Sequence, residues 1–243
     1  MSSEPVPLAI EGVSHRYGST EALRDVSLES ARGQFTVLLG MNGAGKTTLF
    51  NLITRLFGTQ SGRITVGGVD LGRAPSDALA QMGVVFQSRA LDTSLTVAQN
   101  MLYQGALHGL ARRQTLARAE ALLGRMGLSE RMHDKAGRLS GGQQRRVEIA
   151  RALLHKPRLI LCDEATVGLD VRSRADIVAE MHRLAADEGL GVLWTTHLID
   201  EVAPEDPVYV LHKGAILASG SAAEIAGERT LEAAFLALTG TEA

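Results

Sequence analysis

The sequence predicts an α/β fold in which a mostly helical lobe is inserted into a sheet that is covered by helices. Three observations support this prediction. Short β-rich runs open the chain, helical patterns dominate from about Ser94 to His155, and buried-strand runs return at Leu159 to Cys162 and Val192 to Thr195. The later strands alternate with a helical pattern at Ala175 to Asp187, so we expect them to lie parallel in the sheet.

The beginning of the chain combines strands, a glycine-rich loop and a helix. The β-rich runs, separated by turn residues, are Leu8 to Ile10, Leu23 to Leu28, Phe35 to Leu39 and Arg63 to Val66. They indicate a sheet-rich first lobe. After Gly45, apolar residues recur at three- and four-residue steps, which predicts an amphipathic helix. Its apolar face is expected to consist of Leu49, Leu52, Ile53, Leu56 and Phe57.

The composition limits the classes of function. With 243 residues, 45% of them hydrophobic, the chain is long enough to bury a substantial core in one domain. Its formal net charge of −2 leaves no basic excess for neutralising phosphates, so nucleic acid is not an expected partner. The only cysteine, Cys162, excludes an internal disulfide and favours a reducing compartment. No apolar run reaches the ~18 residues that a membrane span needs, and the N-terminus does not resemble a secretory signal, so we expect a cytoplasmic protein.

The segment Gly40 to Thr47 matches the pattern G-x-x-x-x-G-K-S/T of a phosphate-binding loop, and it lies between a predicted strand and a predicted helix. Backbone N–H groups of such a loop converge on a triphosphate, and the helix N-terminus adds partial positive charge. Lys46 is expected to neutralise the β and γ phosphates of ATP, and the Thr47 hydroxyl to ligate Mg²⁺. A glycine-rich turn without function is the alternative, which the flanking strand and helix disfavour. The nucleotide-binding residues predicted here are Gly40, Asn42, Gly43, Ala44, Gly45, Lys46, Thr47 and Thr48.

Two carboxylates follow the predicted strand that ends at Cys162. Since α/β sheets bind ligands at the carboxyl ends of their strands, Asp163 and Glu164 are expected to face the phosphate loop. Asp163 is predicted to hold the Mg²⁺ shell, and Glu164 to accept a proton from the water that attacks the γ phosphate. His197 follows another strand and is predicted to contact the γ phosphate. Each of these residues alone would more often be structural, so the prediction depends on their combination with the Lys46 loop.

The segment Leu139 to Gln143 has the sequence LSGGQ, which is the signature of the nucleotide-binding domains of ABC transporters. The chain resembles that family over nearly its whole length. Tyr17 stands at the position of the adenine-stacking aromatic, Gln87 in the Q-loop, Val167 to Asp170 in the D-loop and His197 at the switch histidine. The resemblance implies the ABC ATPase fold, a P-loop NTPase core with an N-terminal antiparallel β subdomain and an inserted helical subdomain.

The resemblance also implies a single nucleotide-binding domain over residues 1–243. Its RecA-like core is expected at about 1–87 and 156–221, the helical subdomain at about 88–155 and a C-terminal helical tail at about 222–243. The tail has a helical pattern from Thr230 to Leu238, which we interpret as a packing helix; docking on a partner is the alternative.

Family resemblance further implies that two ATPase subunits, expected to be identical, form each ATP site together. The signature residues expected to contact ATP are Ser140, Gly141, Gly142 and Gln143. They would cover the ATP held by the Gly40 to Thr48 loop of the other chain, because the start of the helix that follows the signature forms a second anion site. Asp170 is also expected to contact the nucleotide. Hydrolysis would remove the γ-phosphate contacts that favour the closed dimer.

A separate transmembrane permease is the other partner that the resemblance implies. Gln87 is expected to reach the metal and the attacking water, while about residues 88–103 meet a cytoplasmic helix of the permease. Leu91, Leu95 and Tyr103 are candidate contacts there, although they could equally belong to the core of the helical lobe. The expected location is therefore the inner face of the cell membrane, with peripheral attachment through the permease.

The sequence departs from the family pattern at two loop positions. Met41 and Ala165 stand where prolines are usual, and because neither position supplies a reacting side chain, we expect changed loop stiffness with activity retained. The ending LEAAFLALTG resembles export-type, drug-resistance-like ATPases, and other stretches resemble a bacterial subgroup associated with PQQ-dependent alcohol dehydrogenase systems.

The alternative function is that of a soluble ABC ATPase that acts on nucleic acid or ribosomes, but such proteins usually carry two ATPase domains or long coiled coils. An inactive regulator is disfavoured because every expected catalytic residue is present.

Overall fold

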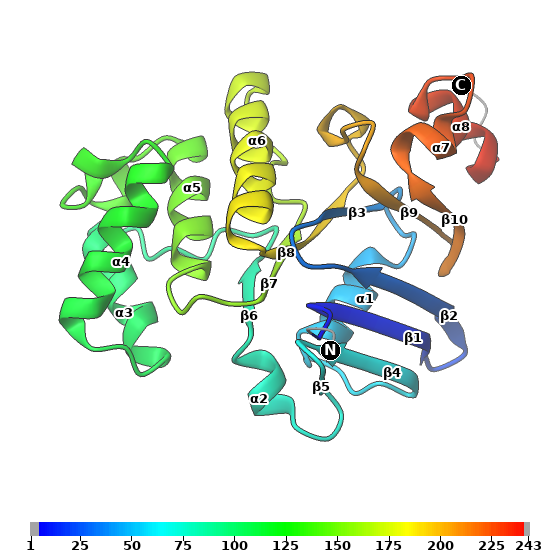
Figure 1. Cartoon of the computed structure of the whole chain (residues 1–243), viewed down its shortest axis with the longest axis horizontal. Coiled ribbons are helices and arrows are strands. Elements are labelled where there is room, and N and C mark those ends of the chain that lie inside the picture. Colours follow the sequence, from blue (N-terminus) through cyan, green and yellow to red (C-terminus); the bar gives the residue numbers. More distant parts are fainter. Residues whose placement is uncertain (1–4, 241–243) are drawn as a thin grey trace.

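The computed structural model describes residues 5–240 of the chain. It contains two β-sheets with a group of helices at one side (Figure 1). The first sheet is antiparallel with the strand order β2-β1-β4-β5. Its strands are β1 (Leu8–Tyr17), β2 (Thr20–Ser30), β4 (Ser61–Val66) and β5 (Val69–Asp70). The second sheet, which we call the core sheet, has the order β10-β9-β3-β8-β7-β6, and only β10 and β9 are antiparallel neighbours. Its strands are β3 (Phe35–Leu39), β6 (Met82–Val85), β7 (Leu159–Asp163), β8 (Gly191–Thr196), β9 (Pro207–His212) and β10 (Ala215–Ser221).

Strand β3 differs from the sequence prediction in the sheet that it joins. The sequence grouped the run Phe35 to Leu39 with the first lobe, whereas β3 lies in the middle of the core sheet between β8 and β9. All five of its residues are buried. A strand with no polar alternation needs cover on both faces, which a central strand of a parallel sheet receives.

The helices divide between the helical lobe and the core. The helical lobe, which lies between β6 and β7 in the chain, contains α3 (Val97–Leu107), α4 (Arg112–Arg125) and α5 (Gly141–Ala152), with 3-10 turns at Ser129–Arg131 and Ala136–Arg138. The other helices are α1 (Lys46–Ile53), α2 (Pro75–Leu79), α6 (Val171–Glu188), α7 (Ala222–Ala226) and α8 (Leu231–Thr239), with a 3-10 turn at Ile199–Glu201. The helical pattern predicted from Ser94 to His155 and the helix predicted at Ala175 to Asp187 are confirmed. Within residues 5–240, no helix combines the length and the apolar character needed to cross a bilayer.

Helix α1 is shorter than its predicted apolar face. Leu49, Leu52 and Ile53 are buried as expected, but Leu56 and Phe57 follow the end of the helix and are 62% and 42% exposed. The prediction was wrong for these two residues because Arg55, with a φ of 61°, takes the left-handed conformation that ends helices.

Two hydrophobic cores lie on opposite faces of the core sheet. Alternate residues of β3 contribute to each, since side chains of a strand point to opposite faces in turn. Leu38 packs in the core that contains α1 and the antiparallel sheet, represented by Leu49 and Ile10. Val37 and Leu39 pack in the core that contains α6 and the helical lobe. The loop that joins β3 to α1 is therefore anchored by both cores.

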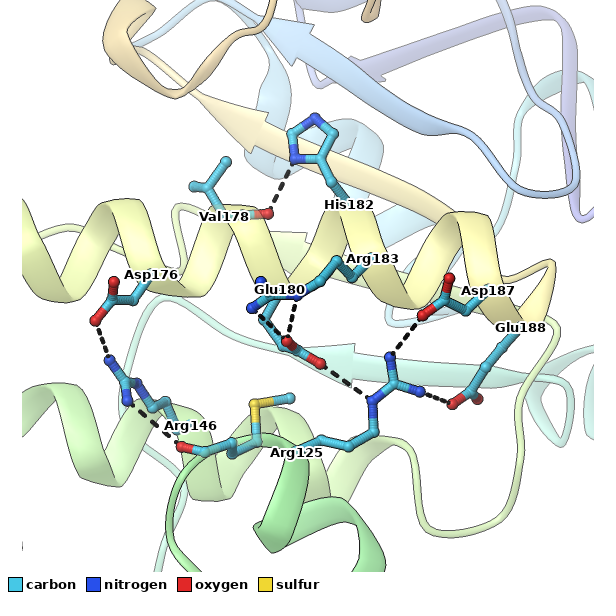
Figure 2. A network of polar contacts seen from close by, with 10 residues as sticks. Arg125, Arg146, Asp176, Val178, Glu180, His182, Arg183, Asp187 and Glu188 are labelled. Carbon is cyan, nitrogen blue, oxygen red and sulfur yellow. Dashed lines mark hydrogen bonds and ion pairs between the residues drawn. The ribbon is translucent and has the colours of Figure 1, made fainter.

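Ion pairs join the helical lobe to helix α6 (Figure 2). Arg125, at the end of α4, contacts three carboxylates of α6. They belong to Glu180, Asp187 and Glu188, at 3.1, 3.4 and 2.5 Å. Arg146 of α5 lies 2.9 Å from Asp176 at the other end of the same helix. These contacts add polar links between the helical lobe and α6 to the hydrophobic core that the two share.

Three apolar residues that were candidate permease contacts have different surroundings. Leu91 belongs to the hydrophobic core, so the core alternative holds for it. Leu95 is half-buried, whereas Tyr103 projects from α3 and is 64% exposed. In the tail, Phe235 of α8 is buried in the hydrophobic core, as a packing helix requires. The N-terminal start of the chain and the predicted domain limits at residues 1 and 243 lie outside the described residues.

Candidate active site

A cavity of about 600 Å³ opens at the carboxyl ends of the parallel strands. Its lining includes Met41, Asn42, Gly43, Gly45, Lys46, Thr47, Thr48, Gln87 and Glu164, together with Thr20, Glu21, Ala22, Lys213 and Gly214. The phosphate loop follows β3, Asp163 and Glu164 close β7, and His197 follows β8. Because these strands are parallel, their ends meet at one edge of the sheet, and residues far apart in sequence surround one space.

Two glycines of the phosphate loop have no room for a side chain. A Cβ on Gly40 would lie 2.7 Å from the carbonyl oxygen of Leu211. Gly45 has a φ of 113°, and a Cβ there would lie 2.9 Å from Leu23 Cδ2. The loop is thus pressed against β9 and β2, and Gly45 at the start of α1 leaves that helix N-terminus open toward the cavity.

The ammonium group of Lys46 is buried at the mouth of the loop. Its Nζ donates to the carbonyl oxygens of Gly40 and Met41, at 2.6 and 3.2 Å, and lies 3.2 Å from Glu164 Oε1. A buried ammonium with two neutral acceptors and one carboxylate is well placed to exchange these contacts for phosphate oxygens. This arrangement fits the phosphate-neutralising role predicted for Lys46.

Glu164 is the residue on which the other predicted catalytic side chains converge. Gln87 Nε2 donates to its Oε2 at 3.2 Å, and His197 Nδ1 lies 3.3 Å from its Oε1. The backbone N–H of Glu164 donates to the carbonyl oxygen of Thr195 at 3.1 Å. Its φ of 44° lies in the left-handed region, which costs a residue with a Cβ about 1 to 2 kcal/mol. Such strain at a buried carboxylate is typical of a residue whose position serves chemistry.

Asp163 is held by the neighbouring strand. Thr195 Oγ1 donates to Asp163 Oδ1 at 2.7 Å. Burial raises the pKa of the Asp163 carboxyl, and the adjacent charge of Glu164 raises it further, while the Thr195 hydrogen bond and the charge of Lys46 act in the opposite direction. A carboxylate that is costly to ionise gains most from a cation bound beside it.

The oxygen donors of the site fit Mg²⁺. Among the residues that the structure describes, no cluster of three or more His, Cys, Asp or Glu side chains forms a metal cage. The predicted ligands are instead one carboxylate, one hydroxyl and one amide, from Asp163, Thr47 and Gln87. Mg²⁺ prefers hard oxygen ligands and keeps several waters and phosphate oxygens, so a short protein ligand set suits it.

The signature segment does not line this cavity. Ser140 and Gln143 instead cap α5, with Gln143 N donating to Ser140 Oγ at 3.3 Å and Ser140 N donating to Gln143 Oε1 at 2.9 Å. Asp170 likewise caps α6 by accepting from Ser173 N at 2.9 Å. A Cβ on Gly142 would lie 2.8 Å from Ser173 Oγ, so the starts of α5 and α6 are packed together. These two helix starts form a second polar surface, separate from the Lys46 cavity.

Tyr17 also lies outside the residues that line the cavity, at the end of β1. Its ring meets His15 and Phe57 edge to face, with centroids 4.7 and 5.7 Å apart, and it is 43% exposed. An exposed aromatic ring held by two others is available for stacking on a base. Phe57, misplaced in the predicted helix, thus has a role beside Tyr17.

Two features of the site were missed by the sequence prediction. Thr195 binds Asp163, and its position at the end of a buried strand two residues before His197 could have indicated this. The Lys213–Gly214 turn between β9 and β10 borders the phosphate loop, with Gly214 N donating to the carbonyl oxygen of Ala44 at 2.8 Å. A lysine-glycine pair between strands indicates a turn, but no local pattern says which loop it will meet.

Comparison with known proteins decides the family. A family model described as "ABC transporter" matches residues 23–167, which is more than half of the chain. The chain belongs to the ABC transporter family. Domains of this family bind and hydrolyse ATP, so the protein is an ATP-binding and ATP-hydrolysing subunit of an ABC transporter. The predicted fold and enzyme class are thereby confirmed, and the rival soluble ATPase is not favoured.

Similar ABC transporter proteins include subunits with different cargoes. The linearmycin resistance ATP-binding protein LnrL of Bacillus subtilis (strain 168) is 36% identical over 219 residues, covering 90% of this chain and 70% of LnrL. The methionine import ATP-binding protein MetN 1 of Rhodococcus jostii (strain RHA1) is 36% identical over 227 residues, covering 90% of this chain and 67% of MetN 1. A solved dimer of the ATP-binding cassette MJ0796, in a post-hydrolysis state bound to ADP and Pi, superposes with a TM-score of 0.75 at 28% identity, covering 88% of this chain and 98% of MJ0796.

Proposed function

We propose that this ABC transporter subunit hydrolyses Mg-ATP in a site completed by a second copy of the chain, and that the resulting movement drives a transmembrane permease. One observation carries the proposal. Lys46, Gln87 and Glu164 meet in one cavity, whereas the signature segment is not part of its lining and caps α5 instead. A site with the phosphate loop but without the signature is half of a nucleotide clamp.

In the proposed reaction, the chain's own groups bind ATP and move one proton. Lys46 exchanges its carbonyl and Glu164 contacts for the β and γ phosphates, and the N–H groups at the start of α1 bind the remaining oxygens. Glu164, released from Lys46, accepts the proton of the attacking water. His197 and Gln87 orient that carboxylate and the water. Thr47, Asp163 and Gln87 would hold Mg²⁺, which supplies neutralisation of phosphate charge when bound.

The second copy supplies the groups that the first lacks. Ser140, the glycines after it and Gln143 would present backbone N–H groups and the N-terminus of α5 to the γ phosphate, with Asp170 beside them. The dimeric structure of MJ0796 in a post-hydrolysis state, bound to ADP and Pi, supports a dimer as the form that hydrolyses ATP. After hydrolysis the differential affinity for the closed dimer is lost, and the population shifts toward the open form.

The exposed apolar residues near Gln87 support a permease contact. Phe86, Tyr103 and Leu107 are 40%, 64% and 65% exposed. They lie beside the Q-loop and along α3, where a cytoplasmic helix of the permease would pack. This contact would place the subunit at the inner face of the cell membrane. The resistance function in the name of LnrL favours export, while MetN 1 shows that equally similar subunits serve import.

Mixing two inactive variants tests the shared site. Lys46→Ala removes the phosphate contact, and Ser140→Arg blocks the signature surface, so each variant alone should have little ATPase activity. In a mixed dimer, the phosphate loop of the Ser140→Arg chain meets the intact signature of the Lys46→Ala chain, and one complete site forms. Phosphate release should therefore rise well above that of either variant at the same total protein concentration. Activity that stays at the level of the single variants contradicts the shared site.

A further inference from the structure

A second large cavity lies at the edge of the core sheet opposite the nucleotide site. It encloses about 850 Å³ and shares no lining residue with the phosphate-loop cavity. Arg158 and Leu190, directly before β7 and β8, form its floor, whereas the nucleotide site lies at the other ends of the same strands. Ala121 and Leu122 of α4 form the opposing wall. The cavity therefore separates the helical lobe from the core on the side away from ATP.

The walls of this cavity combine apolar surface with positive charge. Its apolar residues are Pro5, Pro7, Ala117, Ala121, Leu122, Leu153, Pro157 and Leu190. Its basic residues are Arg32, Arg118, Arg125, Lys156 and Arg158. Among the described residues, Glu188 is the one carboxylate in the lining, and it already lies 2.5 Å from Arg125 Nη1. Of the other basic residues, Arg118, Lys156 and Arg158 give this part of the described lining a positive charge.

Three of these cations are not neutralised by a carboxylate of the described chain. Arg118 Nη1 donates to the carbonyl oxygen of Leu154 at 2.9 Å, a neutral acceptor that leaves the guanidinium charge in place. Lys156 and Arg158 make no ion pair with any carboxylate of residues 5–240. Lys156 lies two residues before Arg158, and both line the cavity. Like charges gathered without a counter-charge attract an anion.

We propose that this cavity binds an anionic amphiphile, a soluble small molecule with a carboxylate, phosphate or sulfonate group on an apolar body. The volume lies in the range of small-molecule sites, about 300 to 1,000 Å³. The acidic group contacts Lys156, Arg158 and Arg118, and the body packs on Leu122, Leu153 and Leu190. Neither half of such a molecule would be left without a matching surface.

The position of the cavity links its occupation to the junction of the two lobes. Arg125 lines the cavity and also pairs with Glu180, Asp187 and Glu188 of α6 (Figure 2). A ligand between α4 and the first residues of β7 and β8 adds contacts across the same junction. Since it binds only when the two lobes are packed together, it raises the thermal midpoint of the protein, and the midpoint rises further with the logarithm of the ligand concentration.

A pair of fluorescent probes tests the proposal. 8-Anilinonaphthalene-1-sulfonate carries the sulfonate, and N-phenyl-1-naphthylamine has the same rings without it. Both are titrated onto the full chain in saturating Mg-ADP, which occupies the phosphate-loop site. We expect the double variant Lys156→Glu/Arg158→Glu to weaken binding of the sulfonate probe about tenfold or more, because charge-assisted contacts are lost, and to leave the neutral probe unchanged.

Two further variants separate the cavity from general charge and from other apolar surfaces. Arg112→Glu/Arg113→Glu makes the same charge change on exposed residues of α4 outside the lining, and should leave the sulfonate probe bound as in the wild type. Ala121→Trp fills the cavity from an exposed helix position and should weaken both probes. Circular dichroism confirms that each variant is folded. Equal effects of the two double variants on the sulfonate probe, or no effect of either, overturn the proposal.

Discussion

Lys46 and Glu164 face each other inside the phosphate-loop cavity, with 3.2 Å between Nζ and Oε1. Both side chains are almost fully buried, at 5% and 9% exposure. A buried ion pair gains little net stability, because the loss of hydration offsets most of the attraction. The pair is better understood as a resting state in which the phosphate-binding cation and the proposed general base hold each other until a triphosphate separates them.

Replacing Glu164 by Gln tests that role. The amide keeps the size of the side chain and one acceptor oxygen, but it cannot accept the proton of water. Turnover should fall by ~10² to 10⁴-fold, the usual contribution of a positioned base, while Mg-ATP binding is kept. Phosphate release measures the first effect, and light scattering after gel filtration in Mg-ATP should detect a trapped dimer. Turnover close to that of the wild type would remove Glu164 from the base role.

Replacing Thr195 by Val tests a positioning residue behind the site. Valine has the shape of threonine, so the change deletes the hydroxyl that donates to Asp163 at 2.7 Å and leaves a buried carboxyl with one partner fewer. We expect a loss of ~1 to 3 kcal/mol in the free energy of unfolding and a higher Mg²⁺ concentration for half-maximal activity. Urea denaturation and a Mg²⁺ titration measure these effects. Thr195→Ser keeps the hydroxyl and should restore the Mg²⁺ dependence; if it fails to, the hydrogen bond is not the cause.

His155 should make stability depend on pH below neutrality. Its ring stacks on His108 with centroids 3.8 Å apart, and burial, together with the charges of His108 and Arg118, lowers its pKa from 6.5 to about 4. Between about pH 6.5 and 4 the unfolded chain therefore binds a proton at this histidine that the folded chain does not. The free energy of unfolding is unaffected by His155 above pH 6.5 and decreases as the pH falls from 6.5 to about 4.

Urea denaturation from pH 7 to pH 4 measures this dependence. In the His155→Gln variant the free energy of unfolding should fall less steeply with decreasing pH than in the wild type. Other groups around the pair, including Glu148 and Arg151, are unchanged in the variant, so their contribution cancels in the comparison. His133→Gln removes an exposed histidine and should leave the wild-type slope. Parallel profiles for His155→Gln and the wild type would exclude the effect.

Arg125 should hold the helical lobe to helix α6. Its side chain is 32% exposed and pairs with three carboxylates. One of them, Glu180, also pairs with Arg183 at 2.6 Å, and replacing Arg125 leaves that ion pair in place. Because exposed ion pairs contribute about 0.2 to 1 kcal/mol each, Arg125→Ala should lower the free energy of unfolding by ~1 kcal/mol, and less at high salt. Arg131→Ala, which breaks one exposed pair with Asp134, is the control. A cost no larger than that of the control would show that the network does not fix the lobe.

Much of the site could be predicted from the sequence because its motifs are local. Gly40 to Thr47 is one continuous loop whose backbone N–H groups are predicted to bind phosphate, and Asp163 with Glu164 ends an apolar strand. The signature at Ser140 to Gln143 is a capping pattern at the start of a helix, and the structure has both reciprocal hydrogen bonds of such a cap. The catalytic and binding roles of these residues stay predictions until the variants are measured.

Contacts between distant segments were beyond the reach of the sequence. The end of the first helix was missed because Arg55, a residue that usually extends helices, takes a left-handed conformation. The bond from Thr195 to Asp163 joins neighbouring strands whose order the sequence does not state. The basic cavity assembles Arg118, Lys156 and Arg158 from segments that carry no common motif.

The α/β architecture, the phosphate loop and the family resemblance follow from the amino-acid order alone, since residue spacing along one strand, loop or helix is enough to specify each of them. Strand order, the meeting of Lys46 with Glu164 and the cavity on the far side of the sheet arise only when the chain packs, because they depend on which buried faces exclude water together. The periodicity of the sequence specifies which face of a helix or strand is buried, whereas packing specifies which other element covers that face.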